Sequence, residues 1–464
     1  MLLRFTCENF LSFRDEVCLN MIASPEKGHD NHVIDSTEGP NVRILRAGAI
    51  YGANASGKSN LVLAMFFARE LIVGGTDPED LLQVEPFQLD ENSSSSPTRM
   101  EFQVKTDGRV FDYGLVMTAR QIVEEWLYVK GAGREAKWFV RQVDEKGDSV
   151  FDFGAQMASN SKDRQFLEFL GRGTRSNQPF LTEGAERNFE KMMPLYLWFR
   201  NVLQIVLPDA EYRPLLFRAS KDRRFVDFLG QLLKMANTGV ESIAWDPIDI
   251  PQEQLLEALP AEASKRLKKA LSDNETFFVG RIGEEEILVS SADGKIQAHS
   301  LRAVHKVSGD KNRQVRFDLR SESDGTRRLV HLAPALLDLG SQERVYVMDE
   351  MDRSLHPKLS RLFVHLFLNM TPIQESQLVF TTHESHLLDQ DLLRRDEVWF
   401  TEKSKEGGSR LYSLAEFNIR RDLKLEKGYL RGRFGGVPLF DEDSPSTILS
   451  SCGEQDEADE HGVA

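Results

Sequence analysis

The sequence predicts an α/β fold built around a parallel sheet, and three stretches of the chain carry this prediction. Apolar, β-rich residues from Val42 to Gly52 end in glycine, and a helix-forming run begins at Ser56. A second apolar run, Arg344 to Glu350, ends in two acids. Residues 326 to 401 then alternate helix-forming and strand-forming segments. This alternation is typical of a domain in which helices cover a buried parallel sheet.

The bulk composition is that of an ordinary globular protein with an acidic balance. The 464 residues are 41% hydrophobic and 28% charged, and the net charge is −15. Eight acids and no Lys or Arg lie between Asp441 and Ala464, so we expect a disordered acidic tail or an acidic arm that binds a partner. The negative net charge argues against a uniformly basic nucleic-acid-binding protein. Only a local basic patch is compatible with this charge.

The three cysteines, Cys7, Cys18 and Cys452, form no CxxC pair, and the histidines show no zinc-binding spacing. We therefore expect a cytoplasmic protein without disulfides or structural zinc. The longest apolar runs, such as Leu61 to Ala68, stop at about eight residues, less than half the length of a membrane-spanning helix. The N-terminus is predicted to form a strand and a turn, not a signal peptide, and no membrane role is expected.

The sequence texture divides the chain into four parts. Residues 1–155 contain strand-forming segments around one helix, and those after the polar loop at 91–98 alternate as in an antiparallel sheet. Residues 156–275 are predicted to be a helical insert, because amphipathic runs follow one another there without a sustained heptad. Residues 276–440 return to strands and then to the α/β alternation, and residues 441–464 are the acidic tail.

The loop after the first apolar strand has the spacing of a phosphate-binding loop. Residues 52–59, GANASGKS, satisfy GxxxxGK[ST] between a predicted strand and a predicted helix. The helix N-terminus adds partial positive charge, Lys58 can reach the β- and γ-phosphates, and the Ser59 hydroxyl can ligate Mg²⁺. The alternative is a glycine-rich turn that matches the pattern by accident. The predicted nucleotide-binding residues are Gly52, Asn54, Ala55, Ser56, Gly57, Lys58, Ser59 and Asn60.

A carboxylate that holds the metal is expected on a neighbouring strand, and the run that ends in Asp349 and Glu350 supplies it. Such a strand is buried on both faces of a parallel sheet, so acids at its carboxyl end emerge at the ligand edge. We predict that Asp349 and Ser59 hold Mg²⁺ and that Glu350 is the catalytic base that polarises the attacking water. The alternative is a strand that merely ends in acids beside a helix.

The residues around this acidic pair resemble motifs of ABC-type ATPases. Residues 349–357, DEMDRSLHP, resemble a Walker B motif followed by a D-loop, and residues 323–326, SDGT, resemble a degenerate ABC signature. In that class the signature of one subunit caps the ATP held by another, which implies that Ser323 and Gly325 act in trans. Asp324 replaces the usual glycine and Thr326 the usual glutamine, so the resemblance implies a weaker cap.

Two further stretches resemble the same class. His383, at the end of the apolar run QLVFTTHE, resembles the switch histidine, which implies a catalytic role in sensing the γ-phosphate and orienting the water beside Glu350. Residues 9–13, NFLSF, resemble the Asn-Phe-x-Ser turn that lies near the nucleotide in SMC-, Rad50- and RecF-like ATPases. Leu11 stands where several of those relatives carry arginine.

Together the motifs resemble the ABC-like ATPases of bacterial antiviral defence, related to the overcoming-lysogenisation-defect proteins and to the ATPase subunits of PARIS-type systems. The resemblance includes residues 86–89, the run TTHESHLLD and residues 428–438. It implies a P-loop NTPase fold, use of ATP and Mg²⁺, ATP hydrolysis, a head-to-head homo-oligomer, a phage-encoded trigger and control of a separate effector. A Toprim nuclease follows the histidine motif in some relatives, and the segment after His383 is too short for one. We therefore expect the nuclease or toxin to be a partner protein.

Two other functions remain open on the sequence. The first is a RecF- or Rad50-like DNA-repair ATPase, against which the lack of a long coiled coil and of a basic balance both weigh. The second is an inactive nucleotide-binding module, against which the intact Lys58, Asp349 and Glu350 argue. Six basic residues from Arg420 to Arg433, near Tyr429 and Phe434, suggest contact with DNA or an acidic partner. The alternative for that segment is a solvated terminal element.

Overall fold

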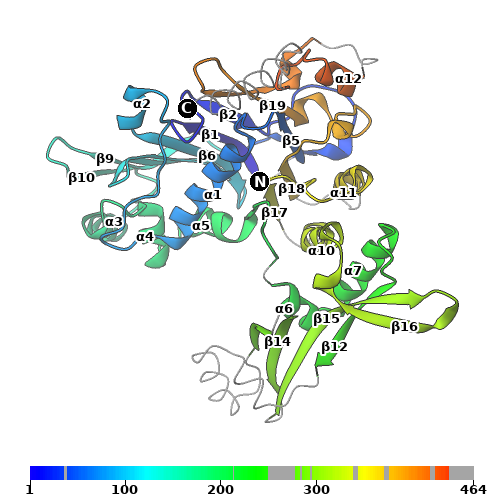
Figure 1. Cartoon of the computed structure of the whole chain (residues 1–464). Coiled ribbons are helices and arrows are strands. Elements are labelled where there is room, and N and C mark those ends of the chain that lie inside the picture. The colour runs from blue at the N-terminus through cyan, green and yellow to red at the C-terminus, as the bar shows by residue number, and fades with distance from the viewer. Residues whose placement is uncertain are drawn as a thin grey trace, which may run out of the picture.

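The computed structural model describes residues 1–437 with eight internal gaps, at 36–38, 213, 249–276, 283–284, 293–294, 338–342, 370–375 and 419–423. The predicted acidic tail and the amphipathic run at 252–273 lie outside the described residues. Two large sheets and a smaller third unit make up the rest (Figure 1).

The central sheet has six strands, and those around the predicted phosphate-binding loop are parallel. Only the last pair is antiparallel. In spatial order the strands are β11 (Leu203–Val206), β17 (Arg344–Met348), β18 (Ser376–Thr381), β5 (Ala47–Gly52), β19 (Val398–Lys403) and β20 (Ser409–Ser413). Every residue of β5 and β18 is buried, which explains why both strands are apolar on both faces.

Helices cover both faces of this sheet, and the alternation along each strand shows which helix covers which face. Ile50 and Val379 pack with α1 (Lys58–Gly74) in one core cluster. Tyr51 and Phe380 pack in a second cluster with α10 (Asp324–Leu337) and α11 (Pro357–Asn369). Successive side chains of a strand point to opposite faces, so the two clusters lie on opposite sides of the sheet.

The second sheet is antiparallel and has seven strands, which confirms the antiparallel subdomain predicted from the alternating segments. It joins α1 in the first core cluster (Figure 1). In spatial order its strands are β10 (Ser149–Phe153), β9 (Ala136–Val143), β8 (Ile122–Lys130), β7 (Arg109–Met117), β6 (Thr98–Thr106), β1 (Leu2–Glu8) and β2 (Val17–Asn20).

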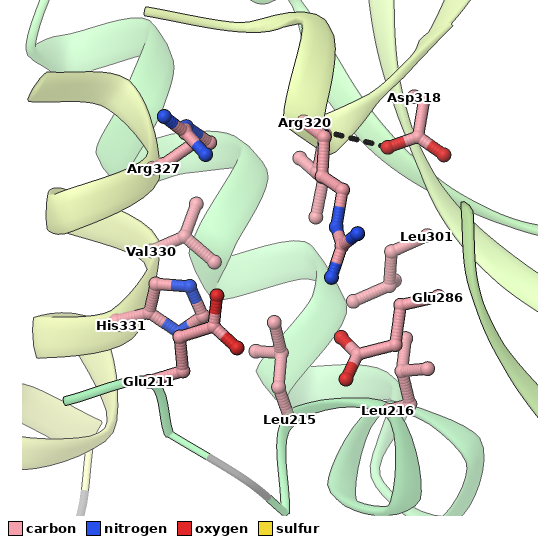
Figure 2. Close-up of a pocket in the computed structure, with 11 residues that line it drawn as sticks. Glu211, Leu215, Leu216, Glu286, Leu301, Asp318, Arg320, Arg327, Val330 and His331 are labelled. Carbon is pink, nitrogen blue, oxygen red and sulfur yellow. Dashed lines mark hydrogen bonds between the residues drawn. The ribbon is translucent and has the colours of Figure 1, made fainter. Parts of the chain in front are cut away.

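A third unit projects from the central sheet beneath α10 (Figure 1). It pairs an antiparallel sheet with α6 (Leu215–Lys221) and α7 (Arg223–Met235). The strands are β12 (Ser242–Ile248), β13 (Phe277–Ile282), β14 (Glu285–Ala292), β15 (Lys295–Val307) and β16 (Asp310–Asp318). Figure 2 shows side chains of this unit and of α10 converging on a small pocket, with His331 of α10 among them. His331 Nδ1 accepts a hydrogen bond from the Tyr212 N–H at 3.1 Å. This contact ties α10 to the segment that enters the third unit just before α6.

The shorter elements connect these layers. They are β3 (Val33–Asp35), β4 (Arg43–Leu45), α2 (Glu91–Ser95), α12 (Leu425–Leu430) and six 3₁₀ or π turns at 30–32, 198–202, 319–321, 385–387, 395–397 and 414–416.

The segment predicted as a helical insert, 156–275, is not helical throughout. It contains α3 (Ser161–Gly173), α4 (Phe180–Glu186), α5 (Met193–Leu197), α6 and α7, but β11 and β12 interrupt them. β11 pairs in parallel with β17 and so completes the central sheet, and β12 pairs with β15. The helical prediction missed both strands because they are short, with four residues in β11 and seven in β12. Beside strongly amphipathic runs, segments of this length show too few alternations of apolar and polar residues to predict a strand.

A buried ion pair ties the antiparallel sheet to α4. The Arg141 Nη1 and Glu125 Oε2 atoms lie 3.5 Å apart, and both side chains are fully buried. Glu125 also accepts hydrogen bonds from the Phe180 and Leu181 N–H groups, at 2.7 and 3.0 Å. Burial raises the pKa of Glu125, and the positive charge of Arg141 opposes that rise. The pair therefore depends on both partners being present.

We expect Arg141→Met to lower the free energy of unfolding by about 3–5 kcal/mol, because it leaves a buried carboxylate without its countercharge. Urea unfolding measures the change. Lys137→Met is the matched control, since Lys137 lies on the same strand and pairs with Asp152 at the surface. That control should change the free energy by less than about 1 kcal/mol. Equal effects of the two substitutions would show that the burial of the pair does not matter.

Candidate nucleotide site

The predicted phosphate-binding loop lies between β5 and α1, and its backbone requires glycine where the chain is most crowded. Gly57 has φ 107°, and a Cβ there would lie 2.6 Å from Ser409 Oγ and 2.8 Å from Ser12 Oγ. The Ser56 hydroxyl bonds Thr401 Oγ1 of β19 at 2.6 Å, which fixes the loop to the next strand. The loop is therefore held in one shape by β19, β20 and the N-terminal turn.

Lys58 is buried at the start of α1. Its Nζ donates hydrogen bonds to the Gly52 and Ala53 carbonyl oxygens, at 2.8 and 3.1 Å. Burial lowers the pKa of Lys58, while the charges of Asp349 and Glu350 oppose that change. The ammonium thus lies over the loop at a helix N-terminus, the position where anions are bound in proteins.

Asp349 and Ser59 lie within hydrogen-bonding distance although 290 residues separate them. The Ser59 hydroxyl donates to Asp349 Oδ1 at 3.2 Å, and the Thr381 hydroxyl donates to the same oxygen at 2.6 Å. A serine hydroxyl beside a carboxylate is a donor set that Mg²⁺ accepts, together with waters and phosphate oxygens. Among the described residues no three His, Cys, Asp or Glu side chains gather as a metal site. The residues present fit Mg²⁺ bound jointly with a nucleotide.

Glu350 follows on a sharply turned backbone. Its φ is 45°, a left-handed conformation that is uncommon for a residue with a side chain. The Glu350 N–H donates to Thr381 Oγ1 at 2.7 Å, and Arg328 of α10 donates to the Glu350 carbonyl oxygen at 3.3 Å. These contacts hold the turn, and the Glu350 Oε2 atom lies 3.9 Å from Arg353 Nη1.

His383 lies two residues beyond β18, at the same edge of the sheet. The backbone N–H of His383 donates to Asp352 Oδ2 at 3.2 Å. Partial burial lowers the pKa of its imidazole, and the positive charge of Lys58 lowers it further. Nearby acids, Asp352 first, oppose this change, and the lowered pKa favours the neutral ring, which can accept a hydrogen bond.

Ser323 and Gly325 lie at the start of α10. The Ser323 hydroxyl accepts a hydrogen bond from the Thr326 N–H at 3.3 Å, and a Cβ on Gly325 would lie 2.6 Å from the Ser354 carbonyl oxygen. The signature-like segment therefore packs against the D-loop-like segment of the same chain. Among the described residues no hydrogen bond connects Ser323 or Gly325 to the loop at 52–60.

Of the remaining predicted residues, Asn54 and Ala55 are exposed at the loop tip, and Ala55 has φ 60°. Asn60 Nδ2 donates to Ser12 Oγ at 2.8 Å, so the Asn-Phe-x-Ser turn lies against the first turn of α1.

Sequence reasoning missed two residues that hold the site together, Thr381 and Thr401. Both are buried threonines at the carboxyl end of an apolar strand beside β5. The signal that could have found them is a hydroxyl residue at the ligand edge of a parallel sheet, where polar groups seldom lie without a partner.

The C-terminal segment contacts the site from the side. The Tyr429 ring lies 5.8 Å from that of Tyr51, and its hydroxyl donates to the Gly436 carbonyl oxygen at 3.1 Å. Tyr429 and Phe434 are buried, so neither ring is available to stack on a nucleic-acid base. In the predicted basic segment, Arg420 and Arg421 lie outside the described residues, and the other four cations are exposed. No helix in the described part of the chain is long and apolar enough to cross a membrane.

Comparison with known proteins gives one family and several distant structures. A search of well-characterised proteins finds no match. Similar solved structures include an SMC head bound to the C-winged helix domain of ScpA (13% identity, 89% of this chain, 97% of that chain, TM-score 0.36) and the SMC head domain from Thermotoga maritima (14%, 89%, 98%, 0.35). Similarity this remote does not support a functional assignment.

Residues 49–189 and 204–389 match a family model that spans both halves of the site. Its description is "AAA domain, putative AbiEii toxin, Type IV TA system". The match includes the phosphate-binding loop, the acidic pair and His383, and it covers well over half of the chain. With its α/β fold and loop geometry, the protein belongs to this AAA family of P-loop ATPases.

Proposed function

We propose that the protein hydrolyses ATP with Mg²⁺ at the edge where β5, β17 and β18 end. The observation that carries this proposal is the Asp349 carboxylate, which accepts hydrogen bonds from both Ser59 and Thr381 beside the buried Lys58. Ser59 and Asp349 would hold Mg²⁺, which neutralises phosphate charge when bound. Lys58 and the N–H groups at the start of α1 would bind the phosphates.

Glu350 is proposed as the general base and His383 as the group that orients the attacking water. Asp349 accepts hydrogen bonds from the Ser59 and Thr381 hydroxyls and would hold the metal, whereas the Glu350 carboxylate lies 3.9 Å from Arg353 and would accept the proton. The neutral His383 ring can accept a hydrogen bond from that water or donate one to the γ-phosphate.

The site as proposed is completed by a second copy of the chain. Ser323 is exposed at the N-terminus of α10, and its segment contacts the D-loop rather than the loop at 52–60. A head-to-head dimer would bring Ser323 and Gly325 of one copy to the ATP of the other. Residues 1–155 and 276–440 would then act as the two halves of one ATPase head.

We expect Glu350→Gln to bind ATP but to hydrolyse it at least about 100-fold more slowly, because an amide cannot accept the proton of water. Phosphate release measures the rate, and a sizing column with ATP should show a stabilised oligomer. Lys58→Ala should lose nucleotide binding, and Glu406→Gln, an exposed acid in the β19–β20 loop, should match the parent. Hydrolysis by Glu350→Gln at the parent rate would reject the assignment of the base.

We expect Thr381→Val to slow hydrolysis by about tenfold and to raise the Mg²⁺ concentration needed for half-maximal rate, since it removes the hydroxyl that positions Asp349 and Glu350. Thr381→Ser keeps the hydroxyl and should retain most of the activity. Titration of Mg²⁺ at saturating ATP makes the measurement. A serine variant as impaired as the valine variant would mean that the methyl group, not the hydrogen bonds, matters.

In the cell, we propose a sensor or scaffold role in anti-phage defence, in which the ATPase controls a separate nuclease or toxin. The sequence motifs of antiviral ATPases and the toxin–antitoxin description of the family support this role. The alternative is a RecF- or Rad50-like DNA-repair ATPase. The C-terminal segment gives it little support, because the Tyr429 and Phe434 rings of that segment are buried and cannot stack on bases.

The defence role predicts that cells carrying this gene with its neighbouring reading frame plate phage at reduced efficiency and that Lys58→Ala abolishes the protection. Plaque counts make the measurement, with the parent and variant expressed at equal levels. Unchanged plating together with sensitivity to DNA damage, and duplex DNA binding by the purified protein near 0.15 M salt, would favour the repair alternative.

A further inference from the structure

The outer face of α1 is apolar although it is not covered by the core. Helices that are apolar all round are normally buried on every side. The inner face of α1 packs between the two sheets, yet Leu63, Phe66 and Phe67 on another face are only half-buried. They line a groove with a volume of about 540 Å³. An apolar surface of this kind beside a ligand-binding loop is typical of an interaction site.

The opposite wall of the groove is formed by the segment that follows α1 and by the N-terminal turn. Leu81, with 59% of its surface exposed, lines it, and so do Phe10 and Leu11 of the turn. The Leu11 N–H donates to the Glu85 carbonyl oxygen at 2.7 Å, and the Phe10 ring lies 5.8 Å from that of Phe67. These contacts join the two walls and the floor, so the groove is a built feature rather than a gap between loops.

The charged side chains that line the groove are all acidic. Glu70, Asp80 and Glu85 line it, and the stretch from 70 to 98 contains seven acids and no Lys, Arg or His. Glu70 pairs with Arg69 on α1, while Asp80 and Glu85 are exposed on the opposite wall. An apolar floor with an acidic rim is complementary to an amphipathic helix that has Lys or Arg beside its apolar face.

We propose that this groove is the docking site for an amphipathic helix of a partner protein, with large apolar side chains on one face and basic residues flanking them. The occupant would bury Leu81 and the α1 face, and its cations would lie against Asp80 and Glu85. Binding as such does not depend on ATP hydrolysis.

The same turn that lines the groove also contacts the nucleotide loop. Phe10 and Leu11 are followed by Ser12, whose hydroxyl accepts from Asn60 Nδ2 at 2.8 Å and whose Oγ lies against Gly57. A helix that shifts the turn would move a contact of both residues. On the proposed ATPase function, the docked partner would therefore change nucleotide affinity or turnover.

The test uses the full chain and a labelled synthetic peptide of about 18 residues, long enough to form a helix, with Leu and Phe on one face and Lys on the flanks. A scrambled peptide of the same composition keeps the net charge but has no apolar helix face. Fluorescence anisotropy should show the amphipathic peptide binding at least tenfold more tightly than the scrambled one. Equal binding would overturn the proposal, because it would show attraction by net charge alone.

Two pairs of variants locate the site. Leu81→Ser should weaken peptide binding about tenfold, whereas Leu430→Ser, at a similarly exposed leucine outside the groove, should leave it unchanged. Glu85→Lys should weaken binding severalfold in a salt-dependent way, and Glu79→Lys, an exposed acid that does not line the groove, should not. Equal effects of the two variants of either pair on peptide binding would overturn the assignment of the groove as the docking site.

The remaining outcomes separate the occupant from the catalytic proposal. Loss of dimer in Leu81→Ser on a sizing column, with no peptide binding by the parent, would show that a second copy fills the groove and would reject the partner helix. Peptide binding that survives in Lys58→Ala would support the docking site even if the protein proved not to hydrolyse ATP.

Discussion

The candidate site depends on the parallel pairing of β18 with its two neighbours, β17 and β5. In this register Met348 lies opposite Phe380 on one side, and Thr381 lies opposite Ile50 on the other. The carboxyl ends of the three strands therefore meet at one edge, where the chain turns into Gly52, Asp349 and His383. A slip of one residue would turn the side chains of the shifted strand to the other face of the sheet and dismantle the site.

At that edge, modest hydrogen bonds set positions that the hydrophobic core could not set alone. Thr381 donates to Asp349 and accepts from the Glu350 N–H, so a single hydroxyl fixes the acid proposed to bind the metal and the turn of the next residue. One such bond contributes only about 0.5–1.5 kcal/mol to stability. Its importance is geometric, because Asp349 and Glu350 are adjacent in sequence and must point in different directions to have different roles.

Lys58 shows how the loop accommodates a buried charge. Its ammonium is satisfied by two loop carbonyls and attracted by the nearby acids. The same helix has its N-terminus at the loop, its inner face in the core and another face along the acidic groove. Nucleotide binding and partner docking would thus act on one rigid element, which is the simplest physical route for coupling between them.

The sequence by itself determined the α/β class, the antiparallel subdomain and the phosphate-binding loop, because these depend on local periodicity and on glycine spacing. It also indicated that Asp349 and Glu350 end a buried strand. Only the tertiary structure showed that Thr381 and Thr401 hold the site, that β11 completes the sheet from within a helical stretch, and that Tyr429 is buried beside Tyr51. These features arise from contacts between residues far apart in the chain, and a local sequence pattern does not report such contacts. The groove beside α1 is a clear case: the run from Ser56 predicted a helix, and only packing decided which face of that helix stays open.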